Sequence, residues 1–226
     1  MARTTVSAMG ELRLYAVGLD EVRGVFGASG ESAARLRAMA QQAFTPAPDE
    51  ARTGLLSKLG PIFRRPPAVQ VISPTQPEPR DVDVLLAGGY VRPERTGATW
   101  RVLETLVCGL AWGSTRLSLT SEALDDLDFA LARGGVSAAV GLRHLLDTSP
   151  SLTLVPVQGL TVGYHPFATA LAMAGAYRAA MPQVKTTEQQ QLISALAGWL
   201  DGFVPWSQAA AAQGRPVPDL VGFWAH

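Results

Sequence analysis

The chain has 226 residues, of which 47% are hydrophobic and 17% charged, so it has ample apolar surface for a folded core. This balance excludes an intrinsically disordered chain. Its 19 basic and 19 acidic residues cancel to a net charge of zero. A protein that mainly binds nucleic acid usually has a basic excess or stripe, so the charge balance argues against that class.

The first fifth of the chain predicts a tail, a strand and helices. Residues 1–9 are expected to form a loose tail, with Met1 and Met9 as alternative start codons. The alternation over Glu11–Val17 is typical of a half-buried strand. Asp20 is placed to cap a short helix, and apolar residues at helical spacing predict a helix over Glu31–Phe44.

A long proline-rich stretch follows. A short helix is expected over Asp49–Leu59, and residues 61–80 then carry six prolines, which favour an extended loop. Val69–Ile72 could add an edge strand within it. The segment before the prolines is too short to bury a core of its own. We therefore expect one globular domain over residues 10–226 with a long loop at 61–80.

The rest of the chain predicts helices with a few short strands. Helical spacing and capping residues predict helices over Asp81–Ala87, Trp100–Ala111 (capped by Thr99), from Thr120 or Ser121 to Gly134, and over Ser137–Asp147, Phe167–Met181, Thr187–Phe203 and Trp206–Gln213. Strands are expected over Thr115–Leu119, within residues 151–164 as two short strands or a bent one, and over Leu220–Trp224.

These elements define the expected fold class. The count indicates a helix-rich α+β domain with a small sheet of short strands. Because the termini of one domain often lie close together, we expect the two terminal strands to belong to one sheet. Burial of Phe223 and Trp224 should then contribute about 2–3 kcal/mol each.

Several signatures of known chemistry are absent from the sequence. It contains no phosphate-binding P-loop, no dinucleotide-binding glycine motif after a strand, no nucleophile elbow and no zinc-protease helix. With three histidines and one cysteine, we expect no metal site and no cofactor. The apolar neighbours of Cys108 predict that this thiol packs as a small core side chain and labels slowly.

Location follows from two further patterns. The N-terminal segment lacks the apolar stretch of a signal peptide, and the longest apolar run, Phe167–Tyr177, is shorter than the about 20 residues that span a bilayer. The expected location is the cytoplasm, with no membrane partner. Arginine outnumbers lysine strongly, since Lys58 and Lys185 are the two lysines, which is typical of a GC-rich bacterial genome.

The strongest catalytic candidates are Tyr164 and His165, where a predicted strand gives way to a helix. The histidine could act as a general base, with the tyrosine as a hydrogen-bond donor. The competing interpretation is structural: Pro166 starts the helix and the tyrosine packs beneath it.

Tryptophans and arginines supply further candidates for contact with a ligand or partner. Trp112 ends a helix, where it could line a cleft, and Trp206 could anchor a partner, as could Trp224. Arg92 and Arg95, with Arg101 nearby, could receive an anion. The competing interpretations are core packing for the tryptophans and a solvated loop for the arginines.

Three segments together resemble a family. They are Leu12–Asp20, the run Leu154–Val157 that leads to Gly163-Tyr164, and the C-terminal segment Trp206–Ala210, Gly214-Arg215 and Asp219–Trp224. This pattern resembles an uncharacterised bacterial family, actinobacterial in character, built on a domain of unknown function. The Val217-Pro218 insertion departs from its shorter link. The resemblance covers about a quarter of the chain and implies no activity and no residue roles.

These observations leave three function classes open. We expect a non-catalytic cytoplasmic protein that binds another protein, in the manner of an immunity protein, an antitoxin or a regulator. The alternative is a small hydrolase or transferase with a cleft near Tyr164 and His165, and a small-ligand sensor is the third. A flat apolar patch would favour the first class, and a deep pocket that holds His165 beside a carboxylate would favour the second.

Overall fold

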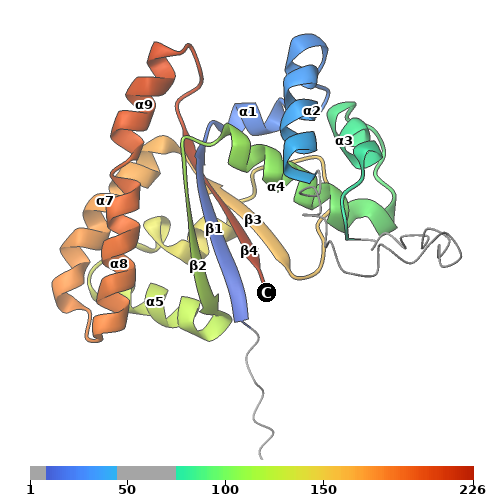
Figure 1. The fold of residues 1–226 in the computed structure, drawn as a ribbon. Helices are drawn as coiled ribbons and strands as arrows, with labels where there is room; N and C mark the ends of the chain where they lie inside the picture. The colour runs from blue at the N-terminus through green and yellow to red at the C-terminus, as the bar shows by residue number, and fades with distance from the viewer. Residues whose placement is uncertain (1–8, 45–74) are drawn as a thin grey trace, which may run out of the picture.

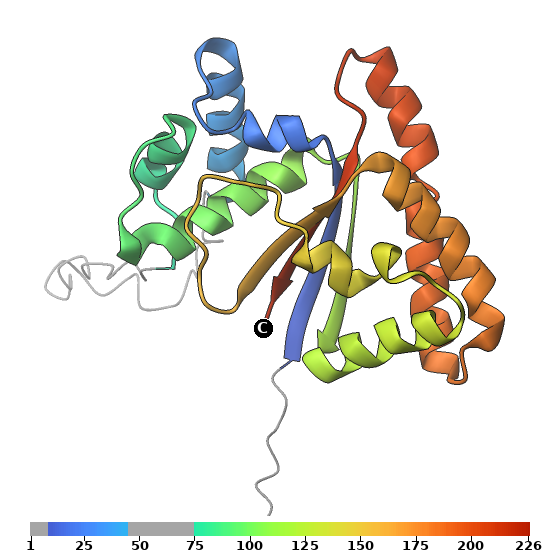
Figure 2. The same cartoon turned by 180° about the vertical axis from the view of Figure 1, so that it is seen from behind.

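A four-stranded antiparallel sheet lies between two layers of helices in the computed structural model, which describes residues 9–44 and 75–226 (Figures 1 and 2). The strands are β1 (Met9–Val17), β2 (Gly113–Thr120), β3 (Leu160–His165) and β4 (Asp219–Ala225), in the order β2-β1-β4-β3. The α+β class is confirmed. So is the expectation for the terminal strands, because β1 and β4 are direct neighbours at the centre of the sheet.

The alternation of the strands divides the interior into two cores. Leu12 and Leu14 of β1 face one core, whereas Tyr15 and Val17 face the other. Five consecutive residues of β4, Leu220–Trp224, are buried because helices cover both of its faces. A central strand with two covered faces reads as a continuous apolar run, and β4 follows this rule.

Each core is completed by its own helical layer (Figure 1). The first layer consists of α1 (Leu19–Arg23), α2 (Gly30–Phe44), α3 (Pro79–Leu86) and α4 (Thr96–Leu110). The second consists of α5 (Ser121–Arg133), α6 (Leu142–Asp147), α7 (Phe167–Ala180), α8 (Thr187–Leu200) and α9 (Phe203–Ala212). Short 3₁₀ turns lie at Pro93–Arg95, Ala138–Val140 and Met181–Gln183.

Asp219, the first residue of β4, ties the two layers together. Its Oδ2 accepts a hydrogen bond from the backbone N–H of Leu19 (2.9 Å), and its Oδ1 accepts one from Phe167 (3.1 Å). One carboxylate therefore satisfies the first turns of α1 and α7. The expectation that Asp20 caps α1 is wrong, because Asp20 lies inside this helix and Asp219 supplies the missing acceptor.

Three other local predictions are corrected by the structure. Helix α4 begins at Thr96, and Thr99 bonds back to the carbonyl of Arg95 instead of capping the helix. The helix expected over Ser137–Asp147 is interrupted at Gly141, where Asp128 caps α6 through the N–H of Leu142 (2.7 Å).

The third correction concerns residues 151–164, which contain the single strand β3 and a preceding loop. Pro156 has no N–H to contribute to a ladder, and Gly159 has a φ of +79°, so the chain turns before it pairs. Some expected elements lie outside the described residues. They are the helix over Asp49–Leu59, the edge strand Val69–Ile72 and most of the loop at 61–80.

Helix α6 packs unusually close to the sheet because two glycines face it. Gly163 of β3 is directly opposite Gly222 of β4. A Cβ atom on Gly163 would overlap the carbonyl oxygen of Leu145 in α6, and one on Gly222 would press on the Leu145 side chain. The absence of side chains at this cross-strand pair lets the helix backbone approach the strands.

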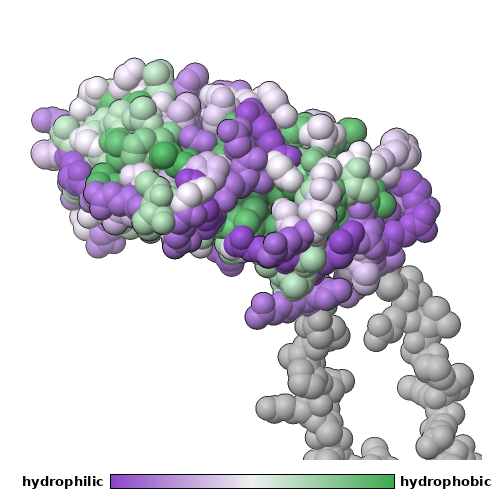
Figure 3. Space-filling view, turned by 90° about the horizontal axis from the view of Figure 1, so that it is seen from above, coloured by the Kyte–Doolittle hydropathy of each residue, from purple (hydrophilic) through white to green (hydrophobic). Residues whose placement is uncertain are grey.

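The surface is mixed in polarity. Viewed from the end where α9 and α2 lie, hydrophilic and hydrophobic residues are interspersed (Figure 3). Among the described residues, the exposed large hydrophobic side chains come from separate elements and loops: Met9, Tyr90, Phe129, Val155, Val204 and Val217. In the described ranges, no helix combines the length and the hydrophobicity that crossing a bilayer requires.

Removal of residues 219–226 should abolish cooperative folding. The deletion takes away the central strand, the carboxylate of Asp219 and the buried rings of Phe223 and Trp224. A thermal melt followed by circular dichroism should show no cooperative transition, whereas deletion of residues 1–8 should shift the midpoint by less than about 2 °C. A normal melt of the C-terminal deletion would contradict this assignment.

Gly163→Ala should destabilise the protein by about 2–3 kcal/mol, because the added methyl group forces α6 away from β3. The matched control is Gly175→Ala in α7, where a Cβ meets nothing within 4 Å. This change should stabilise the protein by about 0.5–1 kcal/mol, since it removes a glycine from a helix interior. Urea unfolding measures the free energy of unfolding of both variants. Equal changes in the two would show that the position of α6 does not depend on its close approach to Gly163.

Candidate functional site

An open groove of about 880 Å³ lies on the described part of the surface. It lies between α2, α4 and the strands β1 and β2. Its lining includes four arginines and one glutamate, together with Tyr15, Cys108 and Met39. The charged residues are Arg13, Arg35, Arg101, Arg116 and Glu104.

One stripe of α4 forms a wall of the groove. Arg101, Glu104, Thr105 and Cys108 follow the spacing of three and four residues that places side chains on one helix face. The opposite stripe of α4, which includes Leu103, Leu106 and Leu110, is buried in the core with the β-sheet. The hydrophobic pattern that packs α4 on the sheet thus turns these polar residues toward the groove.

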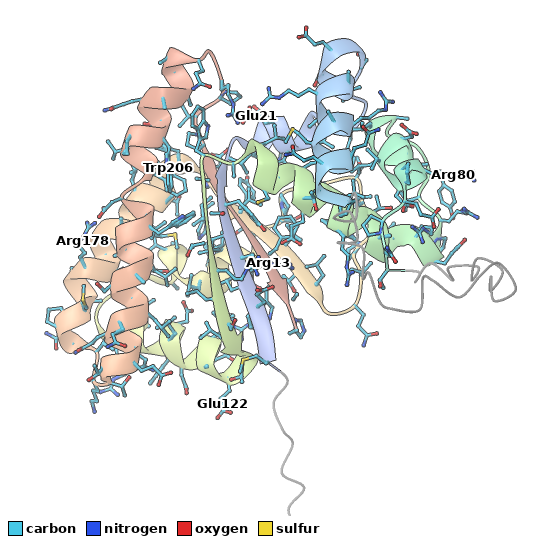
Figure 4. All side chains as sticks on the ribbon, in the orientation of Figure 1. Arg13, Glu21, Arg80, Glu122, Arg178 and Trp206 are labelled. Carbon is cyan, nitrogen blue, oxygen red and sulfur yellow. The ribbon has the colours of Figure 1, made fainter. Side chains whose placement is uncertain are left out.

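The β1–β2 end of the sheet forms the floor. Arg13 of β1 and Arg116 of β2 are direct cross-strand partners, so both side chains project from the same face. The carboxylate of Glu11 forms an ion pair with each of them, at 3.7 Å from an Nη of Arg13 and at 3.0 Å from Nε of Arg116. Figure 4 shows Arg13 near the middle of the sheet, far from Arg80 on α3 and Arg178 on α7.

Glu104 is the most buried charged group of the groove. The hydroxyl of Tyr15 donates to its Oε1 (2.9 Å), and Nε of Arg13 lies 2.8 Å from the same oxygen as an ion pair. Burial raises the pKa of Glu104, and Arg13 opposes this rise. Burial also raises the pKa of Tyr15, with a further contribution from the negative charge of Glu104. The tyrosine therefore stays a neutral donor, and Glu104 holds Arg13 at the floor.

The groove carries more positive charge than its carboxylates neutralise. Arg35 on α2 and Arg101 on α4 are exposed and have no carboxylate within ion-pair distance among the described residues. Glu11 and Glu104 are both engaged with arginines of the sheet. Four arginines against two glutamates leave an excess of two positive charges, which suits an anionic ligand.

Cys108 lies in this groove and is exposed, so the expectation that it packs in the core is wrong. Its sequence neighbours Leu106, Val107 and Leu110 are buried. Cys108 is displaced by about 100° per residue from them around the helix axis, which turns it outward. Apolar neighbours in sequence do not imply burial on an amphipathic helix.

The structure does not bring Tyr164 and His165 together. Successive residues of a strand point to opposite faces, and Tyr164 packs beside the core of the first layer. His165 is 3% exposed on the other face, with its ring 5.4 Å from that of His144 and no hydrogen-bond partner for Nε2. No carboxylate of the described residues is hydrogen bonded or ion paired to His165, and the groove does not include it.

The rings of Trp112 and Trp206 pack against other side chains near the start of β2. The guanidinium of Arg215 stacks over the Trp112 ring at 4.4 Å, and its nitrogens bond Glu21. The Trp206 ring fills the space over Gly113 and contacts Trp199 and Phe203. Trp224 is 2% exposed and belongs to the core, so it is no surface anchor.

Arg92 and Arg95 line a separate pocket of about 250 Å³, together with Arg80 and Tyr90. The guanidinium of Arg95 donates two hydrogen bonds to the carboxylate of Asp81, one from Nε at 3.0 Å and one from Nη2. This hydrogen bonding raises the pKa of Arg95, and Asp81 in turn closes the capping box of α3. Arg92 is exposed and pairs with Glu94 at 3.6 Å. Arg95 thus holds α3 against α4.

Sequence reasoning missed most of the groove. Proximity in the sequence groups Arg101 with Arg92 and Arg95, whereas its side chain lines the groove together with residues of β1 and β2. One signal was available: Glu11 and Arg13 occupy the face of β1 that carries the buried Tyr15 and Val17. Charged residues on an otherwise apolar strand face mark a place where the covering layer ends. Within the described ranges, no three His, Cys, Asp or Glu side chains form a group that could hold a metal ion.

The fold and the groove define an α+β protein with a central sheet, two cores and an arginine-lined groove. The chain belongs to a family described as a domain of unknown function, DUF7691, whose sequence model matches residues 9–225. This confirms the resemblance to an uncharacterised family. Neither the curated proteins nor the solved structures contain a match to the chain.

The buried His165 predicts a loss of stability in acid. Burial first, and then the positive charge of His144, lower the pKa of His165, while a hydrogen bond to the Gly141 carbonyl opposes the shift. Above about pH 6.5 neither the folded nor the unfolded state holds a proton there. Below it the unfolded chain binds the proton more readily, so stability falls by up to about 1.4 kcal/mol per pH unit until the folded pKa is reached.

Urea unfolding between pH 8 and pH 5 measures this slope. His165→Gln should flatten it, whereas His226→Gln, a change at an exposed histidine, should leave it as in the wild type. An unchanged slope in His165→Gln would mean that other groups cause the acid sensitivity.

Proposed function

We propose that this protein is a non-catalytic binding module that holds an acidic segment of a partner protein in the groove between α2, α4 and the β1–β2 floor. The observation that carries the proposal is the convergence of Arg13, Arg35, Arg101 and Arg116 on one groove. Guanidinium groups bind carboxylates through paired hydrogen bonds, and this matches an aspartate- or glutamate-rich segment.

The charges of the groove are divided between its floor and its walls. Arg13 and Arg116 are directly opposed across β1 and β2, and like charges at this position destabilise a sheet. Glu11 bridges them and Glu104 pairs with Arg13, so two carboxylates balance the two cations of the floor. The positive charge that remains for a ligand is therefore that of Arg35 and Arg101 on the helices above the floor.

A carboxylate ligand fits better than a nucleic acid. Because Glu11 and Glu104 pair with arginines of the floor, the groove keeps an excess of two positive charges, which is few for a nucleic acid that carries one charge per nucleotide. The net charge of zero supplies no long-range attraction for such a chain. A groove of about 880 Å³ has room for several side chains of a peptide.

The cellular setting of the proposal is the bacterial cytoplasm, and the role is that of an immunity, antitoxin-like or regulatory protein. The strong preference for arginine over lysine supports a bacterial origin. The exposed free thiol of Cys108 suits a reducing compartment.

The alternative of a small hydrolase or transferase at Tyr164 and His165 has no support in the geometry. A general base must reach its substrate within hydrogen-bond distance, and His165 is enclosed by the α6 layer while Tyr164 points to the other face.

Charge reversal at Arg101 tests the proposal. The probe is a fluorescein-labelled decapeptide of alternating glutamate and valine, and binding is followed by anisotropy at low salt. Arg101→Glu should weaken binding at least tenfold. The matched control is Arg80→Glu, which reverses another exposed helical arginine that has no ion pair among the described residues and lies away from the groove; its affinity should stay within about twofold of wild type.

Two further readouts belong to this experiment. Binding should weaken as salt rises, because the contacts are ionic, and the bound peptide should slow the labelling of Cys108 by a thiol reagent. Equal affinities of the two variants, or no binding of the acidic peptide to the wild type, would overturn the proposed function.

A further inference from the structure

We infer that the acidic segment binds as an extended strand that pairs with the free edge of β2, so that the sheet gains a fifth strand beside the groove. This inference rests on the proposed function and specifies how the partner is recognised. It is carried by the unpaired edge of β2, by the pattern of side chains on β2 and by the charges around it.

The outer edge of β2 has no backbone partner within residues 9–44 and 75–226. In the order β2-β1-β4-β3, β2 is an edge strand of eight residues that pairs on one side with β1. No backbone hydrogen bond joins its other side to any described residue. An edge of this kind presents a row of N–H and C=O groups to which an extended peptide can add.

The opposite edge of the sheet is protected, and the contrast is informative. In β3, the N–H of Tyr164 donates to the carbonyl of Thr148 (3.0 Å), and α6 packs close against the strand. Among the described residues, no such backbone hydrogen bond covers the outer edge of β2. Its pairing with β1 is also continuous from Gly113 to Thr120, and no proline interrupts the strand. Proteins usually block such an edge unless it is used.

The two faces of β2 specify the side chains of the added strand. Ser114, Arg116 and Ser118 point to the groove side and are exposed, and the two serines leave space beside the arginine. On the other face, Leu117 and Leu119 belong to the core. A strand at the usual spacing of about 4.8 Å would therefore place alternate acidic residues beside Arg116 and alternate apolar residues beside these leucines.

The arginines of the groove lie within reach of the acidic row. Arg116 would be in the neighbouring strand and Arg13 one strand further, on the same face. Arg101 and Arg35 stand above this floor on α4 and α2. Backbone pairing would thus supply affinity that is independent of side chains, and the arginines would select an acidic sequence.

A second copy of this chain is a poorer occupant. Strand β2 contains no acidic residue, and Arg116 lies near its middle. Antiparallel pairing of two copies of β2 would bring the two Arg116 side chains close to each other, beside the two Arg13 side chains. Like charges in neighbouring strand positions repel, which disfavours this dimer.

Backbone methylation of the peptide tests the inference. Two versions of the decapeptide carry N-methyl groups, one on every glutamate and the other on every valine, so that each version blocks one edge of the peptide strand. The edge that faces β2 must donate hydrogen bonds, and the other edge faces solvent. One version should bind at least tenfold more weakly than the unmodified peptide, and the other should stay within about threefold.

The outcomes separate the inference from the proposed function. If both methylated peptides bind like the parent, or if both weaken equally, strand addition is overturned. The proposed function still stands in that case if Arg101→Glu weakens binding of the parent peptide and Arg80→Glu does not. Sedimentation of the protein alone should show a monomer; a dimer that the peptide dissociates would overturn the inference in favour of self-pairing.

Discussion

The pairing of β1 with β4 is the contact on which the rest of the structure depends. It places the two ends of the described chain side by side at the centre of the sheet. Leu12 and Trp224 face one core while Tyr15 and Phe223 face the other, so each helical layer packs on residues from both terminal strands. Asp219 adds the electrostatic link, because it caps one helix in each layer.

The groove exists because the two layers cover the sheet unequally. The layer α5–α9 packs on the apolar face of β2 through Leu117 and Leu119. On the other face, α4 buries Tyr15 and leaves Arg13 and Arg116 to form a charged floor. A polar floor, an arginine-bearing wall and a strand edge that is unpaired among the described residues thus meet in one place, and the proposed recognition of a partner is built on this combination.

The sequence predicted the elements better than the site. Period-2 and helical patterns, together with their caps, identified both terminal strands and most helices, because these signals are local. The groove depends on register: Arg13 and Arg116 are distant in sequence and become neighbours through strand pairing alone. The reverse error arose for Tyr164 and His165. They are consecutive in the sequence, which suggested a shared site, but their side chains point to opposite faces of the sheet.

The central position of β4 bears on how the protein is made. Contacts such as that between Leu19 and Asp219 join residues 200 positions apart, and closing so long a loop is slow and entropically costly. During synthesis, β1 emerges from the ribosome about 200 residues before its neighbour β4. Until β4 has emerged, both cores lack the central strand on which their helices pack. The nascent chain should therefore stay incompletely folded over this stretch and depend on chaperones that shield apolar surface.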